Sequence, residues 1–92
     1  MIDRFAQIRQ KYVASFAQKQ VDFKKVWDEK DIIQLHHLLH KLSGSSGSYG
    51  FDELSSLCHR AMALTEKYET KNADELEQYL LGIFAILQNQ GI

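Results

Sequence analysis

The sequence contains no proline, a single cysteine and only five glycines. Because proline interrupts helices and is absent from all 92 residues, the composition indicates a mostly helical chain. Eleven basic and 12 acidic residues give a net charge of -1, which argues against nucleic-acid binding through bulk charge. The lone Cys58 excludes an internal disulfide and is typical of a reducing compartment, so we expect a cytoplasmic location. No apolar run reaches about 18 residues, so we expect no membrane insertion.

The length and the apolar pattern predict one helical domain that spans residues 1–92. With 45% hydrophobic and 25% charged residues, the composition is that of an ordinary globular protein. Apolar residues recur at steps of three and four in four segments, which lie before residue 29, at 32–48, at 51–68 and after 75. This spacing predicts an all-α fold, an up-down antiparallel four-helix bundle with room for an additional short N-terminal helix.

Several polar residues and glycines are expected to mark the helix ends. The first apolar stripe weakens over residues 18–20, which predicts a bend or break and either one long helix or two collinear ones. Capping boxes are expected at Asp31–Gln34 and at Asn72–Glu75. Gly50 is expected at a turn, and Asp52 is expected to cap the helix that follows.

The most informative segment surrounds His40. On a helix with about 100° per residue, His40 lies more than 90° from the middle of the apolar stripe. Gly44 then lies one turn beyond it on the same face, and Gly47 about two turns beyond it. Each glycine inside a helix costs about 1 kcal/mol relative to alanine. Two such residues beside an outward histidine therefore indicate an imidazole that a large partner approaches closely.

An exposed imidazole with clear surroundings can act as a nucleophile toward phosphorus. The Ser43 hydroxyl is expected to donate hydrogen bonds to phosphoryl oxygens, and Lys41 to supply positive charge. Lys41 points about 100° away from His40 and must reach around the helix. His37 is expected on the flank of the site, where it can contact a partner.

This segment resembles the signature of histidine-containing phosphotransfer domains, the relay modules of multistep two-component signalling. That signature reads His-x-Leu-Lys-Gly-Ser-Ser, followed by a glycine, an apolar or aromatic residue and a leucine. The matching residues here are His40-Lys41-Leu42-Ser43-Gly44-Ser45-Ser46, then Gly50-Phe51 and Leu54. The order and length of the helices fit this family over essentially the whole chain.

The resemblance implies a function for His40. It would accept a phosphoryl group from the aspartyl-phosphate of one receiver domain and pass it to an aspartate of another. The implied partners are response-regulator receiver domains and a hybrid sensor kinase, and we expect a monomer. The resemblance further implies a phosphoryl carrier without autokinase activity. No cofactor of its own is expected, because the receiver domain supplies the Mg²⁺.

Two positions depart from the family pattern. Ser43 stands where the family usually has a lysine, and Met62 stands where a glutamate or glutamine often faces the histidine. A methionine cannot orient the imidazole by hydrogen bonding. Phosphoryl affinity and transfer rate are therefore expected to be lower than the family pattern implies.

Two alternatives come from other classes of protein. His36 and His40 are spaced i, i+4 and can chelate zinc from one helix face. His37 and His40, spaced i, i+3, are the alternative pair. Cys58 or His59 could add a ligand, but Cys58 lies on the apolar side of its helix. The other alternative is a helical interaction module without chemistry, for which the candidate docking residues are Tyr49, Tyr79 and Leu81.

Overall fold

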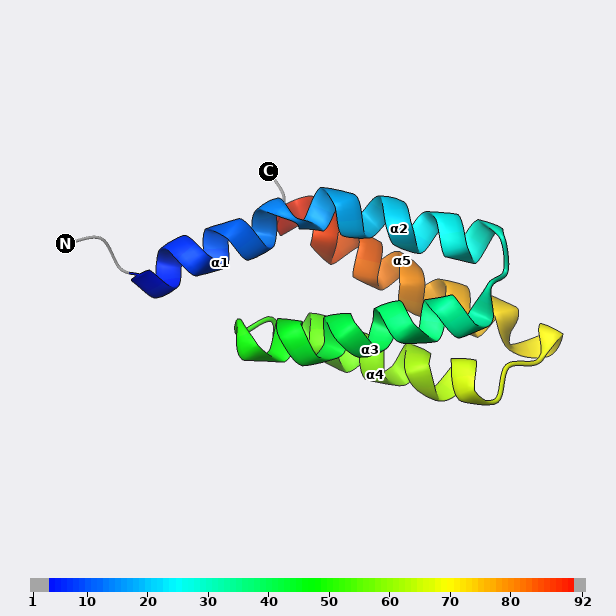
Figure 1. The fold of residues 1–92 in the computed structure, drawn as a ribbon. Coiled ribbons are helices and arrows are strands. Elements are labelled where there is room, and N and C mark those ends of the chain that lie inside the picture. Colours follow the sequence, from blue (N-terminus) through cyan, green and yellow to red (C-terminus); the bar gives the residue numbers. More distant parts are fainter. Residues whose placement is uncertain (1–3, 91–92) are drawn as a thin grey trace.

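The computed structural model describes residues 4–90, which form a helical bundle without strands in that range (Figure 1). Its elements are α1 (Arg4–Ala14), α2 (Phe16–Asp28), α3 (Ile32–Ser48), α4 (Asp52–Glu66), the 3₁₀ turn η1 (Thr70–Asn72) and α5 (Ala73–Gln90). Helices α2 to α5 form a closed ring of neighbours, in which α2 packs on α3 and α5, and α4 packs on the same two helices. The predicted all-α, antiparallel four-helix bundle is confirmed, and α1 is the additional N-terminal helix.

Each helix of the bundle contributes one apolar stripe to a common core. Fully burying a leucine or phenylalanine side chain stabilises the fold by roughly 1.5–3 kcal/mol, so this core provides the main driving force for folding. In α3, Leu35, Leu39, Leu42 and Ser46 are buried, and Ile32 is half-buried. The buried apolar residues are Phe16, Phe23, Trp27, Leu35, Leu39, Leu42, Phe51, Leu54, Cys58, Ala61, Leu76, Leu80, Ile83 and Leu87.

The break between the first two helices falls at Ser15, so the prediction of a break at residues 18–20 is wrong. The Ser15 hydroxyl donates to the Tyr12 carbonyl oxygen at 2.6 Å, and the Lys19 ammonium donates to the same hydroxyl at 2.9 Å. A serine side chain that bonds the backbone competes with regular helix hydrogen bonding. Residues 18–20 lie inside α2, so the weaker apolar stripe there does not mark a helix end.

Of the expected caps, the one at Asp31 is confirmed. Its carboxylate accepts a hydrogen bond from the backbone N–H of Gln34 at 3.2 Å, which satisfies one of the free donors at the start of α3. The expected cap at Asp52 is wrong, because Asp52 is already the first helical residue of α4. Phe51 occupies the N-cap position and forms no side-chain cap hydrogen bond.

The start of α5 also differs from the expected capping box. In the described part of the chain, Asn72 and Glu75 form no side-chain hydrogen bond with each other. The Asn72 amide instead donates to the carbonyl oxygen of Lys67 at 3.3 Å. Asn72 therefore closes the connection between α4 and α5, and it does so from the 3₁₀ turn.

Helix α1 has no buried residue and is attached to the bundle at the C-terminal end of α3. The Tyr12 ring stacks on the Tyr49 ring, with centroids 4.2 Å apart and planes 11° apart. The hydroxyls of Tyr12 and Ser45 are hydrogen-bonded at 2.6 Å, and Arg9 Nε donates to the Tyr49 carbonyl oxygen at 3.3 Å. As Figure 1 shows, α1 continues the direction of α2 past the end of the α3–α4 pair.

Candidate functional site

His40 lies in the middle of α3, and its side chain is exposed, as the helical pattern predicts. Its neighbour Leu39 is completely buried, so the backbone that carries His40 is fixed by the core. Within residues 4–90 no side chain hydrogen-bonds to the His40 imidazole. The ring nitrogens are therefore accessible to a partner.

The two glycines beyond His40 differ in their surroundings. A Cβ atom built on Gly44 would meet nothing within 4 Å, so the surface one turn beyond His40 is open. A Cβ on Gly47 would lie 3.5 Å from Ser55 Oγ of α4, which is ordinary contact. Gly44 thus leaves the approach to His40 clear, whereas Gly47 borders the contact between α3 and α4.

Ser43 is not presented to solvent beside His40. Only 6% of the residue is exposed, and its hydroxyl donates to the backbone carbonyl oxygen of His40 at 2.8 Å. The Ser43 carbonyl oxygen in turn accepts a hydrogen bond from the Ser55 hydroxyl at 3.0 Å. In this arrangement Ser43 joins α3 to α4, and its hydroxyl proton is held by the backbone.

Lys41 is exposed and lies on the α2 side of α3. It borders a hollow of about 320 Å³ whose floor includes Phe23 and Leu38. Lys19 of α2 borders the same hollow and adds a second cation near the site. The sequence alone does not single out Lys19, because only the packing of α2 on α3 shows that the two lysines share a rim.

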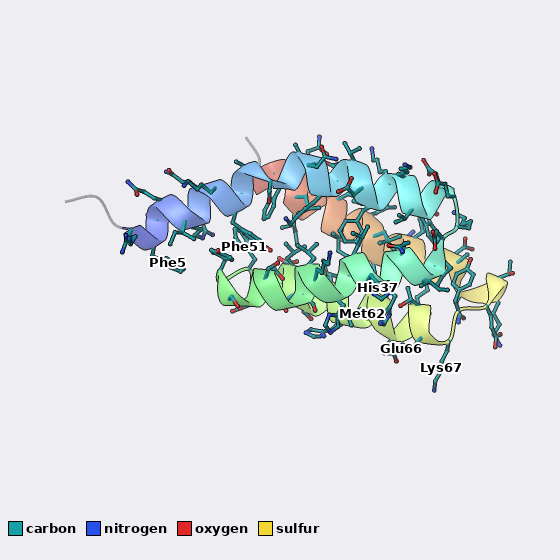
Figure 2. The ribbon with its side chains drawn as sticks, in the orientation of Figure 1. Phe5, His37, Phe51, Met62, Glu66 and Lys67 are labelled. Carbon is teal, nitrogen blue, oxygen red and sulfur yellow. The ribbon has the colours of Figure 1, made fainter. Side chains whose placement is uncertain are left out.

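His36 and His37 lie at a second hollow, between α3 and α4. His37 is exposed, and His36 is half-buried with its Nδ1 atom 2.8 Å from the hydroxyl oxygen of Thr65. Glu66 lines the hollow beside both histidines. In Figure 2, Met62 and Glu66 follow one another along α4, beside the turn of α3 that carries His37.

Met62, at the second departure from the family pattern, is half-buried on α4. Its backbone carbonyl oxygen accepts a hydrogen bond from the Thr65 hydroxyl at 2.8 Å. The thioether carries no hydrogen-bond donor. The orienting contact that a glutamate or glutamine would make at this position is thus not available from Met62.

The arrangement offers little to a metal ion. The structure shows no group of three or more His, Cys, Asp or Glu side chains placed to hold one within residues 4–90. Burial raises the pKa of the Cys58 thiol from 9.0 to about 12, so it stays protonated inside the core. A zinc site that uses Cys58 is therefore not supported by the structure.

The residues considered for a chemistry-free docking patch lie apart from one another. Tyr49 is half-buried and stacks on Tyr12 at the end of α3. Tyr79 is half-buried on α5, and Leu81 of the same helix is 52% exposed. Tyr49 belongs to a different element from the other two, and Tyr79 and Leu81 are two positions apart on α5 and so point to different sides of that helix.

The family model of the Hpt domain matches residues 3–89, nearly the whole chain. The chain therefore belongs to the Hpt domain family, the histidine phosphotransfer modules of two-component phosphorelays. Members of this family are phosphocarriers that interact with receiver domains. No curated protein and no solved structure matches the chain. None of the helices in residues 4–90 is long and apolar enough to span a membrane.

Proposed function

We propose that His40 is the phospho-accepting residue of this phosphotransfer module. It receives a phosphoryl group from an aspartyl-phosphate of one receiver domain and delivers it to the aspartate of another. The observation that carries the proposal is an exposed imidazole followed, one turn later, by the open surface at Gly44. This combination lets a folded partner bring its phosphoaspartate against the ring.

The proposed transfer is a displacement at phosphorus. The lone pair of one imidazole nitrogen forms an N–P bond, while the P–O bond to the aspartate breaks and its electron pair leaves on the carboxylate. The other ring nitrogen keeps its proton. The second half of the relay reverses these steps with a new carboxylate. The carrier has no autokinase step of its own, and the receiver's acidic residues hold the Mg²⁺ that offsets charge on the phosphoryl oxygens.

The charges around His40 favour such a partner. Helix α3 contains Lys41 and three histidines but no acidic residue. With Lys19 on the facing rim, Lys41 outweighs the single carboxylate of Asp22 in the same hollow and presents net positive charge toward the acidic active site of a receiver. His37, exposed on the preceding turn, extends the same face. Receiver domains, including that of a hybrid sensor kinase, are the partners that this surface suits, with the carrier acting as a monomer.

The direct test replaces His40. The wild-type protein and the variants His40→Gln and His37→Gln are each incubated with a phosphorylated receiver domain. We expect acid-labile, base-stable phosphate on the wild type and on His37→Gln, and none on His40→Gln. Uptake of the label by His40→Gln would show that another residue is the acceptor.

A further inference from the structure

One stripe of α4 runs beside the face of α3 that carries His40. Residues separated by three or four positions lie on one side of a helix. Four such residues form this stripe, and Ser55 at one end is hydrogen-bonded to α3. The stripe consists of Ser55, His59, Met62 and Glu66.

The contacts at the two ends define the register of the helices. Ser55 at one end donates to the carbonyl oxygen of Ser43, and Thr65 near the other end is hydrogen-bonded to His36. His40 lies between residues 36 and 43, and thus beside the part of α4 between residues 55 and 65. Interpolation between these two contacts places His40 level with about residue 59, so His59 lies beside it along the helix axis.

The side chains nearest His40 on the α4 side lack a free donor for a phosphoryl group. The Ser43 hydroxyl donates to the backbone of His40, and the Met62 side chain has no donor. His59 is exposed and belongs to the same stripe, so its imidazole can extend over the outside of the α3–α4 contact. Arg60, the next residue, lies about 100° further round α4 and away from α3.

We propose that His59 binds the phosphoryl group carried by His40, through an N–H donor from α4. A histidine N–H to a phosphoryl oxygen is a charge-assisted hydrogen bond, stronger than one between neutral groups. His59 thereby supplies from the neighbouring helix what Ser43 and Met62 do not. The inference rests on the proposed role of His40 and adds a second histidine to the phosphorylated state.

The test compares His59→Gln, His59→Lys and the matched control Arg60→Gln, which alters an exposed cation on the adjacent position. Each is phosphorylated with phosphoramidate, a small donor that needs no docking surface and loses ammonia as the N–P bond forms. We expect His59→Gln, which keeps an N–H donor but loses the charge, to shorten the lifetime of the phosphorylated protein by up to about fivefold, the upper limit for one exposed charge-assisted contact. His59→Lys should restore most of this lifetime, and Arg60→Gln should leave it unchanged.

A spectroscopic readout separates contact from a structural effect. The ring nitrogen signals of His59 should shift when His40 is phosphorylated in the wild type, and should stay fixed in His40→Gln treated in the same way. Label on His40→Gln would overturn the proposed function. Labelling that depends on His40, with His59→Gln matching Arg60→Gln or with His59 ring signals that do not move, would overturn only the role of His59.

Discussion

The Nδ1 atom of His36 lies 2.8 Å from the hydroxyl oxygen of Thr65. The same hydroxyl donates its single proton to the carbonyl oxygen of Met62, also at 2.8 Å. Because that proton is already engaged, the hydroxyl can only accept from His36, and Nδ1 must be the donor. Neutral His36 therefore carries its proton on Nδ1 and its lone pair on Nε2.

Replacing Thr65 tests this assignment. Thr65→Val removes the acceptor and leaves the His36 N–H without its partner, so we expect a loss of about 1–2 kcal/mol in the free energy of unfolding. Nitrogen NMR of the imidazoles should show the Nδ1–H form of His36 at alkaline pH in the wild type and a mixture of tautomers in the variant. An Nε2–H form in the wild type would contradict the hydrogen-bond direction.

Gly44 tests whether the open surface beside His40 matters for transfer. In Gly44→Gln the new side chain extends into empty space, so folding should be unaffected or more stable by about 0.5 kcal/mol through helix propensity. Phosphoryl uptake from a receiver should fall by about tenfold or more, because the side chain obstructs a large partner at van der Waals distance. Uptake rates with a receiver and with phosphoramidate should be compared, since only the former requires close docking. A variant that unfolds, or that accepts from the receiver at the wild-type rate, would contradict the interpretation.

Gly50 has a conformational role that is separate from the site. Its φ of 84° lies in the left-handed region, at the turn between α3 and α4. Gly50→Ala should lower the free energy of unfolding by about 1–2 kcal/mol while leaving phosphorylation of His40 intact. Gly47→Ala is the control, because its Cβ makes ordinary contact and helix propensity favours alanine. Urea denaturation of both variants measures the difference, and equal effects would argue against the strained turn.

The buried thiol of Cys58 makes the free energy of unfolding depend on pH in the alkaline range. Burial raises the pKa of its thiol from 9.0 to about 12, so the folded state holds a proton that the unfolded state releases. The associated stability is fully present below about pH 9 and is lost as pH rises toward 12. Burial also raises the pKa of Tyr12 above 10.0, which adds a loss of the same sign.

Unfolding at a series of pH values, compared between wild type and Cys58→Ala, isolates the contribution of the thiol. The variant should lose less stability between about pH 9 and pH 11 than the wild type does. The thiol should also resist alkylation in the native protein and react after denaturation. Rapid native alkylation would show that the residue is accessible.

Helical periodicity was sufficient to predict the class of fold and the inner face of α3. The apolar stripe formed by Leu35, Leu39 and Leu42 can be removed from water only by packing against other helices. The exposed position of His40 follows from the same periodicity. The cap at Asp31 was also predictable, because it depends on residues three positions apart.

The features that could not be predicted depend on contacts distant in sequence or on competing local bonds. The hydroxyl of Ser15 bonds to the Tyr12 carbonyl oxygen where α1 ends. Helix propensity alone does not show whether a serine side chain will bond to the backbone in this way or face solvent. The Ser43 hydroxyl was expected to face a phosphoryl group, yet it turns to the backbone of its own helix. The second cation at the rim, Lys19, requires the packing of α2 on α3.

Helix α1 has a consequence for the dynamics of the protein. Because none of its residues is fully buried and only Tyr12 and Val13 pack against the core, its detachment exposes less apolar surface than the opening of a bundle helix, which disrupts the core itself. Amide hydrogens of α1 should then exchange through a local opening of low free energy, while those around Leu39 exchange only through global unfolding. When α1 opens, Tyr12 no longer stacks on Tyr49, and the C-terminal turns of α3 lose this support. The mobility of α1 and the mobility of the surface beyond His40 are therefore thermodynamically coupled.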